Sequence, residues 1–292
     1  MTTSESRLRA GWRLVIHTLL ILILSVLFGI VFFIPIGVLK IDFDSPLAML
    51  ANELTLFFSI TIATYLARRF LDKRPIISLG LKPGSKALMD IAIGILIAFF
   101  QMGLIFGLEI SLGWTKFEGF AWNTLPAQEV TTGIGIWLLI FILVGWQEEL
   151  LSRGYHLQTI TSGLNLFFGV VISSSIFGFL HIFNPGATIL STLGIFLAGL
   201  FLALPFILTR QLWLSMGLHL GWNFFEGVVF GFPVSGLETF RLLRHTVNGP
   251  ETWTGGIFGP EAGLIIIPAL ILGSLLVFAY ARRKSEYPIL KK

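Results

Sequence analysis

Long apolar runs, separated by short polar segments, make up most of this chain. A helix that crosses the hydrocarbon core of a bilayer needs about 20 apolar residues. The pattern therefore predicts about eight transmembrane helices, at roughly 13–39, 47–67, 88–113, 131–157, 165–183, 187–209, 212–230 and 261–281. The remaining long segment, 231–260, is rich in glycine and proline and is predicted to be an irregular but fairly apolar loop.

The composition points to lipid as the main solvent. Of 292 residues, 55% are apolar and 12% are charged, whereas a soluble domain has about 25% charged residues. The mean hydropathy is +0.86. We therefore expect an all-α fold, a single integral membrane domain over 1–292, with its helices around a polar cavity. The chain contains no cysteine, which excludes disulfides, thiolate catalysis and cysteine-ligated metals.

Basic residues lie between the apolar runs, as membrane-flanking charges do, and this argues against nucleic-acid binding. The 68–86 segment and the C-terminal tail are rich in lysine and arginine, whereas 115–130 holds one lysine. By the positive-inside rule, both termini are expected on the cytoplasmic side, in a prokaryotic plasma membrane. The apolar run at 14–39 is too long for a cleaved signal peptide, so we expect a retained first helix.

Ionisable residues inside the predicted spans point to a functional site, because a charge within a bilayer is energetically costly. The fourth span contains Glu148, Glu149 and Arg153. Glu149 and Arg153 are four residues apart, which predicts an ion pair on one helix face. Glu148 points about 100° away from that face. It has no partner in its own helix and is expected to meet a group from another helix.

Two further spans supply imidazole and carboxamide groups. His181 lies in the fifth span, while His219 and Asn223 share one face of the seventh. A desolvated glutamate can take a proton from water, and an imidazole can orient or activate that water. A second imidazole and a carboxamide can donate hydrogen bonds to the oxyanion of a tetrahedral intermediate. These residue types from three helices predict a hydrolytic site.

Other hydrolytic mechanisms have less support in the sequence. The chain has no Gly-x-Ser-x-Gly motif and no His-Glu-x-x-His helix, and its four aspartates lie at or outside the ends of the predicted spans. Zinc stays open as an alternative, because Glu148, His181 and His219 can form a His₂Glu ligand set.

Three motifs follow one another on separate apolar segments: Glu-Glu-x-x-x-Arg at 148–153, Phe-x-x-x-His at 177–181 and His-x-x-x-Asn at 219–223. In this arrangement the chain resembles the CPBP family of intramembrane endopeptidases. That family includes type II CAAX prenyl endopeptidases and bacteriocin-processing, Abi-like proteins. The resemblance covers roughly 131–236, which we take as a catalytic core of the CPBP type.

The resemblance implies an intramembrane endopeptidase that acts on a membrane-associated protein or peptide, with membrane lipid as its other partner. It implies that Glu148 and His181 activate the water and that His219 and Asn223 form the oxyanion site. Glu149 and Arg153 would support the site. No cofactor is expected. A non-catalytic scaffold or immunity protein that uses the same cavity to bind a peptide or partner is the main alternative. A proton-coupled transporter is a weaker one, because paired broken helices are not evident.

One geometric requirement follows from these spans. His181 is expected near the outer end of its helix, whereas Glu148 and His219 are expected nearer the cytoplasmic side. At about 1.5 Å per residue, the three can meet only if the 158–166 connection dips inward or the fifth helix is tilted or short. Glu53, near the outer end of the second span, is expected to be interfacial or to support the site from behind.

Overall fold

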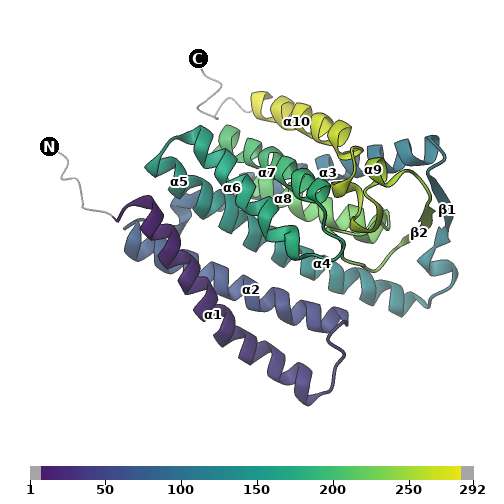
Figure 1. Ribbon diagram of the computed structural model, residues 1–292, viewed down its shortest axis with the longest axis horizontal. Helices are drawn as coiled ribbons and strands as arrows, with labels where there is room; N and C mark the ends of the chain where they lie inside the picture. Colours follow the sequence, from purple (N-terminus) through teal and green to yellow (C-terminus); the bar gives the residue numbers. More distant parts are fainter. Residues whose placement is uncertain (1–7, 284–292) are drawn as a thin grey trace.

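The computed structural model describes residues 8–283, and these are mostly helical (Figure 1). The helices are α1 (Ala10–Val38), α2 (Pro46–Leu66), α3 (Ser85–Ser111), α4 (Ala127–Glu149), α5 (Leu157–Gly163), α6 (Leu166–Leu180), α7 (Ile189–Thr209), α8 (Trp213–Asn223), α9 (Glu251–Thr254) and α10 (Ile266–Arg283). Within the described range, seven helices are long and apolar enough to cross a membrane. The predicted all-α class of polytopic membrane protein is confirmed.

Between residues 8 and 283, three π-helical segments extend the α-helices: Ala67–Leu71 after α2, Leu150–His156 between α4 and α5, and Phe224–Val229 after α8. The seventh expected span, 212–230, is therefore helical but short, since it consists of the 11-residue α8 and a six-residue π-helical segment. The α4–α5 unit forms one 37-residue helix, from Ala127 to Gly163. Short 3₁₀ turns lie at Ile76–Leu79, Ala121–Asn123, His181–Phe183, Gly256–Phe258 and Pro260–Ala262.

The long α4–α5 helix and the short α6 bring two site residues to the same depth. Glu148 precedes Gly163 by 15 residues, and His181 follows Leu166 by 15 residues. At ~1.5 Å per residue, both lie about 22 Å along their helices from the turn that joins α5 to α6. The α6 helix has 15 residues. The sequence analysis expected Glu148, His181 and His219 to meet only with a dipping connection or with a tilted or short fifth helix. The fifth predicted helix corresponds to α6, and α6 is short.

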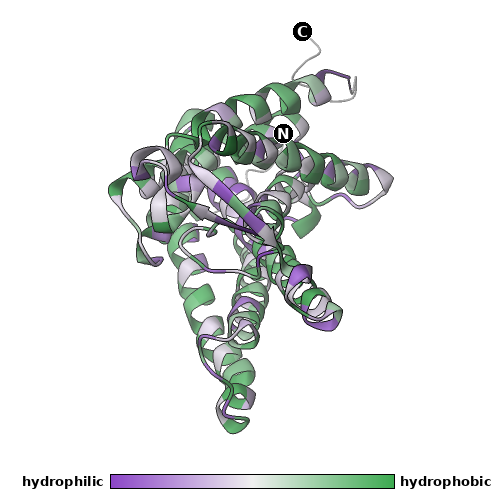
Figure 2. Cartoon of the chain, turned by 90° about the vertical axis from the view of Figure 1, so that its right-hand side faces the viewer, coloured by the Kyte–Doolittle hydropathy of each residue, from purple (hydrophilic) through white to green (hydrophobic). Residues whose placement is uncertain are grey.

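A two-stranded antiparallel sheet departs from the purely helical expectation. Strand β1 (Thr115–Phe120) pairs with β2 (Leu243–Val247), so the 231–260 segment is more ordered than the irregular loop that was predicted. The two strands are far apart in the sequence, so a local pattern does not reveal their pairing. Figure 2 faces this end of the molecule and shows a hydrophilic strand among mostly hydrophobic helices.

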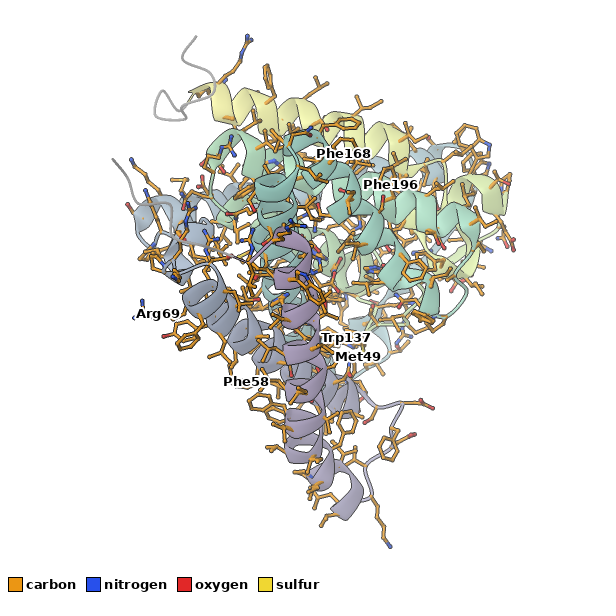
Figure 3. All side chains as sticks on the ribbon, turned by 60° about the vertical axis from the view of Figure 1, so that its left-hand side comes forward. Met49, Phe58, Arg69, Trp137, Phe168 and Phe196 are labelled. Carbon is orange, nitrogen blue, oxygen red and sulfur yellow. The ribbon has the colours of Figure 1, made fainter. Side chains whose placement is uncertain are left out.

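Helices α1 and α2 form a pair that leans away from the other helices at one end (Figures 1 and 3). Near the start of α1, Arg13 donates hydrogen bonds to Asp72 and, over 2.6 Å, to the Ser162 hydroxyl. One turn later, the His17 Nε2 atom lies 3.0 Å from the Thr64 hydroxyl. These buried polar contacts attach the beginning of α1 to the other helices.

Glycines set the position of α8, which packs closely against α3. A Cβ atom added at Gly217 would lie 2.3 Å from a backbone oxygen of α3, and one at Gly221 would lie 2.8 Å from a backbone carbon of α3. Small residues four positions apart allow two membrane helices to approach this closely. Because α8 carries His219 and Asn223, the contact fixes the depth and rotation of both side chains.

Gly217→Ala is expected to destabilise the protein by about 1–3 kcal/mol, because the new methyl group overlaps the α3 backbone. The measurement is the thermal midpoint of unfolding in detergent. Gly107→Ala is the matched control, since a Cβ atom at Gly107 in α3 meets nothing within 4 Å. Equal midpoints for the two variants would show that α3 and α8 are not in close backbone contact.

Candidate active site

One large cavity contains the residues that the three motifs predict. Its volume is about 1430 Å³, and residues from α1, α2, α4, α6, α7, α8, α10 and the 231–260 segment line it. Four of the predicted site residues are in its wall: Glu148, His181, His219 and Asn223. Much of the remaining wall is apolar, and Figure 3 shows two of its residues, Met49 of α2 and Trp137 of α4, close together.

Glu148 faces two imidazoles that come from other helices. Its Oε2 atom lies 3.7 Å from His219 Nε2 and 4.0 Å from His181 Nε2. That oxygen accepts no hydrogen bond from another described residue, and the side chain is 26% exposed. Both distances are longer than the length of a direct hydrogen bond. They leave room for a bridging atom between the carboxylate and the imidazoles, such as a water oxygen. The carboxylate that lacked a partner in its own helix therefore meets both predicted histidines.

Hydrogen bonds at Nδ1 orient both rings. His181 Nδ1 lies 2.8 Å from the Phe177 carbonyl oxygen, and His219 Nδ1 lies 2.9 Å from Glu149 Oε1. A carbonyl and a carboxylate can only accept, so each Nδ1 donates its proton. Each Nε2 then faces Glu148. The spacing of the Phe-x-x-x-His motif thus places a carbonyl where it holds the histidine ring.

Glu149 and Arg153 form the predicted ion pair, and they lie behind the cavity wall. Arg153 Nη1 donates to Glu149 Oε1 over 2.8 Å, and Nη2 donates to the Gly199 carbonyl over 3.1 Å. The guanidinium also lies 4.5 Å from the centre of the Phe177 ring. Both charged side chains are almost completely buried. Because Glu149 also accepts from His219, the pair orients a histidine of the site.

Asn223 lies one helical turn beyond His219, and the structure puts both at the cavity. This agrees with the shared helix face that their spacing predicted. An amide Nδ2 and an imidazole Nε2 on one face can both donate to a single oxyanion.

Glu53 is part of the cavity wall. Its Oε1 accepts from Asn52 Nδ2 over 3.0 Å, and its Oε2 accepts from Gln147 Nε2 over 2.5 Å. Hydropathy placed Glu53 near a helix end, but it did not show which face of α2 is turned toward α4. Gln147 gave no separate signal, because it is next to the more conspicuous acidic pair.

Glu261 also lines the cavity, although the sequence did not single it out. It lies in a 3₁₀ turn just before α10, and its Oε2 accepts from the Ser235 hydroxyl over 2.5 Å. Burial raises the pKa of the Glu261 carboxyl, and the nearby charges of His181 and His219 oppose that rise. A glutamate in a segment rich in glycine and proline resembles an ordinary loop residue, so only the three-dimensional fold reveals its position.

Residues 8–283 contain no group of three or more histidine, aspartate or glutamate side chains arranged to hold a metal ion. The set left open for zinc, Glu148, His181 and His219, has separations of 3.7 and 4.0 Å from the carboxylate oxygen to the two nitrogens. Two ligands of a tetrahedral zinc ion are roughly 3.4 Å apart when the bonds are about 2.1 Å long. Both separations are therefore wider than those between two zinc ligands.

Comparison with known proteins agrees with this arrangement. Residues 130–225 match the family model described as type II CAAX prenyl endopeptidase, Rce1-like. No curated protein and no solved structure matches the chain. The matched segment includes all three motifs, so the resemblance predicted from them is confirmed over these residues. The apolar helices indicate an integral membrane protein, and residues 130–225 of it are similar to the type II CAAX prenyl endopeptidases.

Arg153→Ala is expected to lower the folded yield and to destabilise the protein by about 3–5 kcal/mol, because it leaves Glu149 buried without a counter-charge. The yield and the thermal midpoint in detergent measure this effect. The control is Arg241→Ala, which breaks a more exposed pair with Glu238 that is worth about 0–1 kcal/mol. A stable but inactive Arg153→Ala protein would instead place Arg153 in the chemistry or in substrate binding.

Proposed function

We propose that this protein is an intramembrane endopeptidase that hydrolyses a peptide bond of a membrane-associated protein or peptide. One observation carries the proposal: the Glu148 carboxylate lies within 3.7 and 4.0 Å of the Nε2 atoms of two histidines in the wall of a large cavity. The family match over 130–225 supports peptide-bond hydrolysis as the type of reaction. The Lys/Arg-rich 68–86 segment supports cytoplasmic termini, as expected for a prokaryotic plasma membrane protein.

In the proposed reaction, a water molecule is held between Glu148 and His181. Glu148 takes a proton as the water oxygen attacks the carbonyl carbon of the scissile bond. Proton transfer of this kind typically contributes about 10²–10⁴-fold to the rate. The same proton then passes from Glu148 to the leaving amine as the carbon–nitrogen bond breaks.

The tetrahedral intermediate carries a negative oxygen, and His219 and Asn223 are the proposed donors to it. The Nδ1 atom of His219 already donates to Glu149, so Nε2 can donate only when the ring is an imidazolium. Glu149 supplies the counter-charge for that form, and Arg153 balances Glu149. Loss of one oxyanion donor typically lowers kcat by about 10²–10³-fold.

Glu148→Gln is expected to abolish cleavage while leaving expression and detergent stability nearly unchanged, because it retains the shape of the side chain but removes the base. The substrate can be identified by comparing the membrane proteomes of wild type and Glu148→Ala for a protein that is no longer cleaved. Glu129→Gln, an exposed position in the first turn of α4, is the control. Proteolysis by Glu148→Gln within about tenfold of wild type would reject its role as general base.

We further propose that the mechanism is independent of metal. The purified protein is expected to remain active in strong chelator and to contain well under one equivalent of zinc. The separations of the His181 and His219 Nε2 atoms from Glu148, which are wider than those between zinc ligands, support proton transfer and hydrogen bonding. Elemental analysis combined with a chelator titration tests this. Stoichiometric zinc, with activity lost on its removal and restored on re-addition, would overturn the metal-free mechanism but not the protease assignment.

A further inference from the structure

We propose that the cavity selects substrates with a positively charged residue near the scissile bond, and that Glu53 and Glu261 bind this residue. The proposal rests on the proposed function, since it concerns the substrate of the same site. Five acidic residues of the described range line the cavity, and Glu53, Glu148 and Glu261 are three of them. Glu148 is assigned to the chemistry, which leaves the other two for recognition.

Glu53 is fixed in the wall by neutral groups only. Its two oxygens accept from the amides of Asn52 and Gln147 over 3.0 and 2.5 Å. The side chain is 6% exposed. Neutral donors hold the carboxylate in place without cancelling its charge, and a buried charge without a counter-ion is unfavourable. An ammonium or guanidinium group of a substrate would supply the missing positive charge.

Gln147 provides a second, independent sign of a ligand with hydrogen-bond donors. It lines the cavity and is 1% exposed, and its Oε1 atom has no hydrogen-bond partner among the described residues. A buried carbonyl oxygen normally has a donor. The Gln147 oxygen and the Glu53 carboxylate are thus two acceptors side by side, and lysine and arginine side chains are donors without acceptors.

Glu261 is a similar acceptor on the histidine side of the site. Its Oε2 is held by the Ser235 hydroxyl, and the Ser235 carbonyl is held by Asn184 Nδ2 over 2.9 Å. Glu261 lies in the same cavity wall as His181 and His219, and Glu53 accepts a hydrogen bond from Gln147, the residue before Glu148. A cation bound at either carboxylate therefore lies near the reacting atoms.

The other acidic residues of the wall are less suited to this role. Glu238 is paired with Arg241, and Asp44 is exposed at the α1–α2 connection. No lysine or arginine among residues 8–283 lines the cavity, and the basic groups that act on Glu261 there are the imidazoles of His181 and His219. The resulting field attracts a basic residue and repels a free terminal carboxylate, which favours internal bonds beside lysine or arginine.

The test uses the purified full-length protein and quenched-fluorescence peptides that differ at one position in a common apolar segment. That position holds Lys, Gln or Glu, and each peptide is made with a free and with an amidated C-terminus. The Lys peptide is expected to have a kcat/KM at least about tenfold above that of the Glu peptide, and amidation is expected to favour cleavage. Glu53→Gln and Glu261→Gln should each reduce the preference, whereas Glu129→Gln should retain it.

Binding to the Glu148→Gln protein separates this inference from the proposed function. Fluorescence anisotropy of the same peptides is expected to show tighter binding of the Lys peptide. If wild type cleaves no peptide but this binding preference is present, the protease assignment fails and the recognition proposal stands. Cleavage without a charge preference, or with a preference for Glu or a free C-terminus, overturns the recognition proposal and leaves the protease intact. Equal binding of all the peptides also overturns it.

Discussion

A buried arginine holds together the parts of this site that come from different helices. Arg153 of α4–α5 pairs with Glu149, contacts the carbonyl of Gly199 in α7, and lies on the ring of Phe177 in α6. Through Glu149 it also orients His219 of α8. A guanidinium has five donors in a fixed plane, so it can serve several partners at once. Four helices are therefore aligned relative to one another by a single charged group.

The lengths and the packing of the helices bring them to the Arg153 guanidinium. The 37-residue α4–α5 helix and the short α6 place Glu148 and His181 at similar distances from their common turn. The glycines of α8 allow it to lie against the α3 backbone, which sets the depth of His219. Each contact is specific to one helix pair, and together they bring the three motifs to one cavity wall.

The sequence predicts the helices and the motif residues because both depend on strong local signals. Long apolar runs mark the spans, and a charge such as Glu148 inside a span is conspicuous. The β1–β2 pairing and the π-helical segments depend on tertiary contacts, so hydropathy does not show them. The roles of Glu53 and Glu261 also require the fold, because one lies near a helix end and the other in a loop. The sequence therefore indicates the candidate site residues, while the structure identifies the residues that surround them.

The carboxyl groups of the site differ in their partners: one is paired with an arginine, and two are held by neutral groups. Glu149, behind the wall, is neutralised by Arg153 and shares its oxygen with His219. Glu53 and Glu261, in the wall, are held by neutral amides and a hydroxyl. A protein that needed these two only for stability could pair them as it pairs Glu149, or replace them with apolar residues at little loss. Both carboxyl groups line the cavity, where no lysine or arginine of residues 8–283 faces them, so a cation of an incoming group can pair with either one, as expected of a binding surface.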